Sequence, residues 1–401
     1  MLIEFRVSNY RLFNEEVVFS MVAAPRLRKT GNTFKTHLKK DALPPLLKTA
    51  VIYGPNASGK SNFVKALNTL KGVFSNSDAE RKAFNVQPFK LNEPTDTVSK
   101  FCIAFIQADM RYEFGLWLTK ERVIKEWLRY YPLGQEVLLF ERQYNTNTLT
   151  DDYYFDNQLE GDDALHQLWK NLVSSKALFI KQAAANSNDT FKQLKQPVEW
   201  FKNLFVMGVQ DMKPFTKATQ DVLINNSKLL ESTVHLISSA DIPIARIAIK
   251  QSSDFLGIDI VETKMTHDLG GKLVELDFED ESDGTKNLFT FAPLWELSKT
   301  RFKVFIFDEF DSSLHPEIVA KLVEEQSNNP NNSQFIFTTH DTHLMSKKIL
   351  RRDQFWFVER TRQGSSRITS LYEYKGSEGE DIEKRYYQGR YRALPVKSKG
   401  I

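Results

Sequence analysis

The chain contains, at positions 54–61, the sequence Gly54-Pro55-Asn56-Ala57-Ser58-Gly59-Lys60-Ser61. It fits G-x-x-x-x-G-K-[ST], the pattern of a phosphate-binding loop. A short apolar stretch at 48–53 precedes the loop, and residues 62–70 follow it with apolar side chains at helical spacing. Strand, glycine loop and helix in this order are the context that the motif requires. We therefore predict a phosphate-binding loop rather than a surface turn with an incidental lysine.

The residue types explain how such a loop holds an anion. Gly54 and Gly59 lack a Cβ atom, so the backbone can curl and turn its N–H groups inward. The helix that follows adds the positive end of its dipole. Lys60 is expected to reach the β- and γ-phosphates of a nucleoside triphosphate, and the Ser61 hydroxyl to ligate Mg²⁺. The predicted nucleotide-binding residues here are Gly54, Pro55, Asn56, Ala57, Ser58, Gly59, Lys60, Ser61 and Asn62.

The composition is that of a globular protein with nearly balanced charge. Of 401 residues, 41% are hydrophobic and 26% charged, and the formal net charge is +3, so composition alone does not indicate nucleic-acid binding. Cys102 is the single cysteine, which excludes an intramolecular disulfide and fits a reducing cytosol. Neither a signal peptide nor an apolar stretch of membrane-spanning length is found. We expect a cytoplasmic protein without a membrane partner.

Apolar patterns predict how the chain is organised. A hairpin is expected from residues 2–7 and 16–19, followed by antiparallel strands at 97–107, 111–118, 123–131 and 136–142. Residues 162–239 are predicted to be helical, and Gly270-Gly271 is expected to turn a hairpin between 258–263 and 273–278. The predicted divisions are an N-terminal lobe at 1–160, a helical insertion at 161–240 and a C-terminal lobe at 241–401.

Two segments are basic. Residues 26–40 are expected to form a solvated loop, with contact to a phosphate backbone as the alternative. Residues 384–399 mix basic and aromatic side chains, which suits either stacking on nucleic acid or a packed C-terminal tail.

A second set of polar residues follows apolar strands in the last third of the chain. Val304-Phe305-Ile306-Phe307 leads into Asp308 and Glu309, a Walker B arrangement. Asp308 is predicted to hold Mg²⁺ together with Ser61, and Glu309 to orient or deprotonate the attacking water. His340 ends another predicted strand, where it can touch a γ-phosphate. A hydrogen-bonded surface histidine is its alternative.

Residues 281–285 read Glu281-Ser282-Asp283-Gly284-Thr285 and precede a predicted helix. A Ser-x-Gly at a helix N-terminus offers a hydroxyl and N–H groups to an anion. The alternative is that Ser282 only caps the helix.

The ordered motifs resemble the head of an ABC-type ATPase. They are similar to the branch that holds SMC and RecF heads, the zinc-hook repair ATPases and related bacterial AAA-family ATPases. Residues 281–285 resemble the signature motif of that branch, 308–316 its Walker B and D-loop, and 338–341 its H-loop. Residues 352–357 and 387–391 further resemble RloA-like bacterial ATPases. The implied fold is α/β, a P-loop NTPase head of ABC type with an antiparallel β subdomain and an inserted helical subdomain.

The resemblance implies ATP and Mg²⁺ as cofactors, and ATP hydrolysis as the activity. It implies a head-to-tail homodimer, or a higher even-numbered homo-oligomer, in which Ser282 and Gly284 contact the γ-phosphate held by the partner. Gln182 is the available candidate for the Q-loop glutamine. The helical insertion is too short for a long coiled coil and has no zinc-hook Cys-x-x-Cys.

The resemblance also suggests a biological role. RloA-like ATPases resemble sensor components of anti-phage systems that work beside a separately encoded effector, a nuclease or toxin. No nuclease signature is found in this chain, which fits that division. One alternative is a switch that binds ATP with negligible turnover and sequesters an effector. The other is a RecF-like clamp on DNA, supported by the two basic segments.

Overall fold

The computed structural model describes residues 1–38, 41–76, 82–91, 97–208, 212–253, 259–298, 304–311, 314–346, 349–377 and 379–394. Ser312 and Ser313 of the predicted D-loop, and the ends of both basic segments, lie outside these residues. Within the described residues, the strands form two large sheets and two small ones. No helix in these ranges is both long enough and apolar enough to cross a bilayer.

The first large sheet is antiparallel, in the order β10-β9-β8-β7-β6-β1-β2. Its strands are β1 (Leu2–Ser8), β2 (Val17–Ser20), β6 (Ser99–Gln107), β7 (Met110–Leu118), β8 (Val123–Tyr130), β9 (Val137–Asn145) and β10 (Thr150–Phe155). The predicted hairpin and antiparallel strands are confirmed, whereas β10 was not predicted. Cys102 is buried in β6, and this burial raises the pKa of its thiol to about 12. It is therefore a packed residue, as the sequence suggested.

The second large sheet carries the predicted site. Its order is β11-β15-β16-β5-β17-β18, and only β18 runs antiparallel to its neighbour. The strands are β5 (Thr49–Tyr53), β11 (Leu204–Met207), β15 (Val304–Phe307), β16 (Gln334–Thr338), β17 (Phe355–Arg360) and β18 (Ser366–Ser370).

Both faces of this central sheet are buried. Along β5, Ala50 and Ile52 belong to one hydrophobic core while Val51 and Tyr53 belong to another, because successive side chains of a strand point to opposite faces. The first core also holds the apolar face of α1 (Lys60–Ser75) and the inner face of the antiparallel sheet. The second core is closed by α7 (Asp283–Ser298), α8 (Pro316–Asn328) and α10 (Ile382–Tyr387). Burial on two sides explains why β11 and β15 are apolar throughout.

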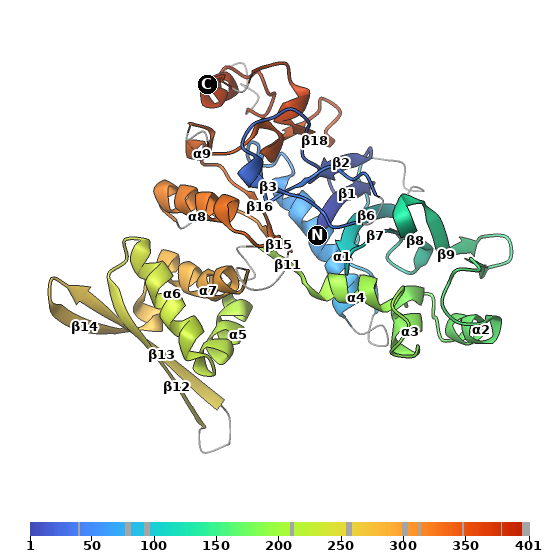
Figure 1. Cartoon of the computed structure of the whole chain (residues 1–401), viewed down its shortest axis with the longest axis horizontal. Coiled ribbons are helices and arrows are strands. Elements are labelled where there is room, and N and C mark those ends of the chain that lie inside the picture. Colours follow the sequence, from blue (N-terminus) through green and yellow to red (C-terminus); the bar gives the residue numbers. More distant parts are fainter. Residues whose placement is uncertain are drawn as a thin grey trace.

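A separate lobe projects from the body, at the lower left of Figure 1. It contains α5 (Met212–Ile224), α6 (Ser227–Ser239), α7 and a three-stranded sheet of β12 (Ile244–Ser253), β13 (Asp259–Leu269) and β14 (Lys272–Asp277). Gly270 and Gly271 have positive φ angles of 69° and 91° and turn β13 into β14, as predicted.

The stretch predicted as one helical insertion is divided in the structure. Its first part, α2 (Asp163–Asn171), α3 (Phe179–Ala185) and α4 (Lys195–Lys202), packs against the antiparallel sheet and α1. Strand β11 then enters the central sheet, and only α5 and α6 belong to the projecting lobe (Figure 1). The domain limits at 160 and 240 remain a proposal. Strand β11, in the middle of the predicted insertion, belongs to the central sheet that carries the site.

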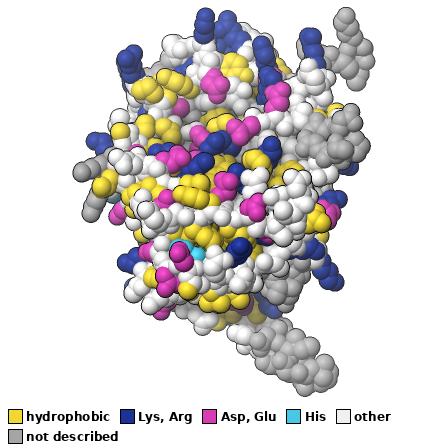
Figure 2. Space-filling view, turned by 90° about the vertical axis from the view of Figure 1, so that its right-hand side faces the viewer, with side chains coloured by type: hydrophobic (Ala, Val, Ile, Leu, Met, Phe, Trp, Pro, Cys, Tyr) yellow, Lys and Arg dark blue, Asp and Glu magenta, His cyan; other side chains and the backbone are white. Residues whose placement is uncertain are grey.

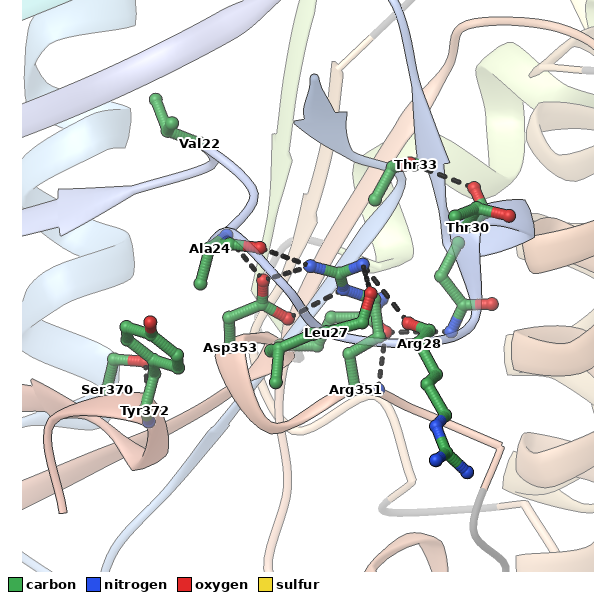
Figure 3. Close-up of polar contacts among 12 residues, drawn as sticks. Val22, Ala24, Leu27, Arg28, Thr30, Thr33, Arg351, Asp353, Ser370 and Tyr372 are labelled. Carbon is green, nitrogen blue, oxygen red and sulfur yellow. Dashed lines mark hydrogen bonds and ion pairs between the residues drawn. The ribbon is translucent and has the colours of Figure 1, made fainter. Parts of the chain in front are cut away.

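The first basic segment is held by a buried turn, η5 (Arg352–Gln354), and by the residue before it. The Arg351 guanidinium donates to the Ala24, Leu27 and Arg28 carbonyls and to the Asp353 carboxylate, while Asp353 also accepts from the Ala24 N–H (Figure 3). In the same turn, Gln354 donates to the Thr49 carbonyl at the start of β5. Residues 352–354, the start of the stretch that resembles RloA-like ATPases, therefore hold the chain beside β5, the strand that leads into the phosphate loop.

The described part of the C-terminal segment is packed only in part, since Tyr387, Arg390 and Arg392 are exposed. Tyr386 and Tyr391 stack on Phe357 of β17, with ring centroids 5.7 and 4.9 Å apart, and are buried. These rings are not available to stack on nucleic acid. On the face shown in Figure 2, the described acidic and basic side chains are interspersed among hydrophobic ones rather than segregated.

Candidate functional site

The register of the central sheet brings the predicted site residues to one edge. Phe307 of β15 is level with Phe337 of β16, and Thr338 of β16 is level with Ile52 of β5. Asp308, the residues after Thr338 and the phosphate loop therefore follow their strands at the same carboxyl edge. This edge is where open parallel sheets bind ligands.

The two glycines of the phosphate loop lie where the neighbouring strands leave no room for a side chain. Gly59 has φ +118°, and a Cβ atom there would lie 2.8 Å from Ser366 Oγ of β18. A Cβ atom on Gly54 would lie 2.5 Å from the Val358 carbonyl of β17. Strands β17 and β18 thus pack directly behind the loop and exclude any side chain at these two positions. Helix α1 begins immediately afterwards, at Lys60.

The Lys60 ammonium lies at the base of the loop. It donates to the Gly54 carbonyl at 2.7 Å, the Pro55 carbonyl at 3.3 Å, and is 2.9 Å from His340 Nε2. Burial lowers the pKa of Lys60 to about 8, although the nearby carboxylates of Asp308, Glu309 and Asp311 act in the opposite direction. Partial burial, and then the Lys60 charge, also lower the pKa of His340. His340 therefore contacts the residue expected to bind the γ-phosphate.

Thr338 connects the Asp308 carboxylate to the main chain of Glu309. Its hydroxyl donates to Asp308 Oδ1 at 2.7 Å and accepts from the Glu309 N–H at 2.7 Å. Glu309 has φ 53°, in the left-handed region that costs a non-glycine residue roughly 1 kcal/mol. The contact with Thr338 holds the main chain of this turn. The sequence placed Thr338 at a strand end but could not show this contact.

The residues that could hold Mg²⁺ share one pocket. Ser61, Asp308 and Glu309 all line a pocket of about 1350 Å³. Within the described ranges, no group of three or more His, Cys, Asp or Glu residues could hold a metal ion by itself. A hydroxyl and one carboxylate still fit Mg²⁺, because this ion keeps several waters and takes its remaining oxygen ligands from phosphates. The arrangement suits a metal that arrives with a nucleotide.

Ser282 and Gly284 lie elsewhere. Ser282 caps α7, accepting from the Thr285 N–H at 3.2 Å and lying 2.9 Å from the Thr285 hydroxyl. Its neighbour Glu281 is buried and bonded to His267 of β13 at 2.6 Å. This segment belongs to the projecting lobe, and the described contacts of Ser282 are with its own helix. The chain's own phosphate loop is not among them.

The position of Gln182 contradicts its predicted role. Gln182 is in α3, and the adjacent Lys181 donates to the carbonyls of Val73 and Asn76 at the far end of α1. At about 1.5 Å rise per residue, this end is roughly 20 Å from Lys60. Gln182 therefore cannot position a metal beside Ser61 in this structure.

Strand β11, which the sequence did not predict, brings the chain to the same pocket. It pairs with β15, the Asp308 N–H donates to the Met207 carbonyl, and Gly208 lines the pocket. Gln210 follows two residues later and lies outside the described residues. The short apolar run at 204–207 was the signal for this strand in the sequence. It was hidden because a four-residue apolar run looks the same in a helix.

A protein-family model described as "AAA domain, putative AbiEii toxin, Type IV TA system" matches residues 50–346, more than half of the chain. The chain belongs to this AAA-domain family. The match includes the phosphate loop, the Walker B carboxylates and His340, and confirms the predicted membership of the AAA-type P-loop ATPases. No curated protein matches the chain.

Solved structures of SMC heads are similar to this AAA-domain protein. A head bound to the C-terminal winged-helix domain of ScpA is 15% identical, with a TM-score of 0.47, covering 92% of this chain and 97% of that one. The head from Thermotoga maritima is 16% identical, with a TM-score of 0.42 and coverage of 92% and 98%. The head with an extended coiled coil, from Pyrococcus furiosus, is 14% identical, with a TM-score of 0.44 and coverage of 98% and 99%.

Nucleotide binding by this AAA-domain protein is expected to weaken as the pH rises. With a Lys60 pKa of about 8, roughly one tenth of the side chain is protonated at pH 9, against most of it at pH 7. The charged form binds phosphate, so the ATP affinity should fall about tenfold between pH 7 and pH 9. Titration with a fluorescent ATP analogue at each pH measures this.

Lys60→Arg is the control for this titration, since arginine stays charged over the whole range. Its affinity should be nearly constant with pH, whatever its absolute value. An equal fall in both proteins would assign the pH effect to another group.

Proposed function

We propose that the chain is an ATPase that hydrolyses ATP to ADP and phosphate between two copies joined head to tail. The observation that carries the proposal is the Thr338 bridge, which fixes Asp308 and Glu309 together beside the pocket that Ser61 enters. Lys60 and the loop N–H groups bind the phosphates, and His340, in contact with Lys60, senses the γ-phosphate.

The chemistry is divided among few groups. Mg²⁺, held by Ser61 and Asp308, would neutralise charge on the phosphates. Glu309 accepts a proton from the water that attacks the γ-phosphate, which completes hydrolysis without a covalent enzyme intermediate. Thr338 keeps Glu309 aimed at the pocket, so the base need not reorganise before the reaction.

The head-to-tail arrangement is supported by the position of Ser282. The signature segment lies on the projecting lobe, and the described hydrogen bonds of Ser282 are made within its own helix. A second copy can bring this helix N-terminus, with its positive dipole end, to the phosphates. Each copy then completes the site of the other.

Ser282→Asp tests the dimer without removing the helix cap. Aspartate caps a helix as well as serine, but it would place a negative charge against the partner's γ-phosphate. We expect unchanged thermal stability, loss of the ATP-dependent dimer in sedimentation velocity, and at least tenfold slower turnover. Ser227→Asp, at the exposed start of α6, is the matched control and should behave as the wild type. A Ser282→Asp protein that still dimerises with ATP would exclude the segment from the interface.

The biological proposal is a regulatory ATPase of a bacterial anti-phage system that controls a separately encoded nuclease or toxin. The family description mentions a toxin–antitoxin system, which supports this class of role. ATP-driven joining and separation of two heads is a conformational change that a partner can sense. Wild-type turnover at background despite tight ATP binding would instead favour a switch that sequesters its effector.

A further inference from the structure

The pocket beside Ser61 continues as a long groove on α1. Its volume, about 1350 Å³, exceeds the roughly 300–1,000 Å³ of ordinary small-molecule sites. The lining residues Lys65, Asn68, Gly72 and Asn76 follow one another along a single face of α1. The helix is roughly 24 Å long, so the groove runs well beyond the phosphate loop.

This groove, called here the α1 groove, is cationic. Asp308 and Glu309 lie at the end near Ser61, and the other charged residues among those described as lining it are basic: Arg11, Lys65, Lys71 and Lys82. Lys65 and Lys82 are exposed. A ligand of the α1 groove therefore has to be anionic, and it meets repulsion only at the carboxylate end.

The chain itself carries an acidic segment, residues 277–283, whose charge is opposite to that of the α1 groove. Its exposed acids are Asp277, Glu279, Asp280 and Asp283. Two buried residues anchor it, Phe278 against Phe289 and Glu281 on His267. Asp277 pairs with Lys264 of β13 at 3.7 Å, and the other three acids are exposed as well. Ser282 lies inside this segment.

We propose that the acidic segment of one copy docks into the α1 groove of a second copy. The inference rests on the proposed head-to-tail dimer, because a Ser282 brought to the partner's phosphate loop brings its neighbours to the groove that starts at Ser61. An extended chain covers at most about 3.5 Å per residue, so Glu279 and Asp280 reach roughly 7–10 Å from Ser282. Lys65 lies one helical turn beyond Ser61, within that reach.

The partner is a second copy rather than the same chain. Within one chain the acidic segment lies on the projecting lobe while α1 lies in the centre of the body (Figure 1). The carboxylates of Asp308 and Glu309 at the groove entrance turn incoming acids toward the lysines of α1, which sets the direction of docking.

Charge reversal in two full-length variants tests the docking. The groove variant carries Lys65→Glu and Lys71→Glu, and the segment variant carries Glu279→Lys and Asp280→Lys. In a homodimer of either variant, both groove–segment contacts bring like charges together. Sedimentation velocity with ATP and Mg²⁺ should therefore show a dimer affinity at least tenfold weaker than that of the wild type. Mixing the two variants pairs each reversed surface with its complement, and a heterodimer of near wild-type affinity is expected.

Matched controls and three outcomes decide the test. Lys375→Glu with Lys384→Glu, both exposed in the C-terminal region, should dimerise as the wild type does. If the wild type dimerises and the charge-reversed variants dimerise equally well, the proposed docking is wrong and the proposed head-to-tail dimer is kept. If the wild type forms no dimer with ATP, both proposals fall. If the groove variant loses ATP affinity but dimerises normally at saturating ATP, the α1 groove is part of the nucleotide site and the docking is overturned.

Discussion

Glu309→Gln is expected to slow ATP turnover by roughly 10²–10⁴-fold, the usual contribution of a general base. Glutamine has almost the same shape but cannot accept the proton from the attacking water. The main-chain contact of residue 309 with Thr338 does not involve the side chain, so the turn should be kept. Phosphate release in the steady state measures turnover. Titration with a fluorescent ATP analogue measures binding, which should be nearly unchanged because the groups that hold the phosphates are kept.

Glu324→Gln is the matched control, because Glu324 is an exposed glutamate on α8 outside the pocket lining. Its turnover should equal that of the wild type. Undiminished turnover in Glu309→Gln would remove Glu309 from the role of base. Loss of ATP binding in that variant would show instead that the Glu309 carboxylate is needed to bind the nucleotide.

Lys60→Met should reduce ATP affinity by at least about 100-fold, which corresponds to roughly 3 kcal/mol of binding free energy. Methionine keeps much of the apolar stem but removes the ammonium that meets the phosphates. Lys60 is buried at the base of the loop. Isothermal titration with ATP and Mg²⁺ gives the affinity, and the unfolding midpoint shows whether the fold is intact.

Lys228→Met, an exposed lysine on α6, controls for loss of charge alone and should bind ATP normally. Tight ATP binding by a folded Lys60→Met protein would contradict the assignment of the phosphate loop. The pH experiment is independent of this variant, since it depends on the titration of Lys60 in the wild type.

Much of the fold followed from local patterns. The hairpin of β1 and β2 and the strands β6 to β9 could be predicted because they are apolar or alternating runs separated by polar turn residues, and β6 to β9 are eight or nine residues long. Strand β11 gave no such pattern, because a parallel strand buried on both faces is uniformly apolar and short. The Q-loop glutamine was predicted in α3, which lies at the far end of α1 from Lys60.

The sequence by itself determined the phosphate loop, because its chemistry is contiguous: the glycines, Lys60 and Ser61 follow one strand and open one helix. It also marked Asp308, Glu309 and His340 as strand-end residues. Only the tertiary structure brings these residues together. The parallel register of β15, β16 and β5 places His340 in contact with Lys60, and Thr338 in contact with Asp308. The tertiary structure likewise separated Ser282 and Gln182 from Lys60. Steric preferences act between neighbours in sequence, whereas strand register depends on side-chain packing between segments far apart in the chain.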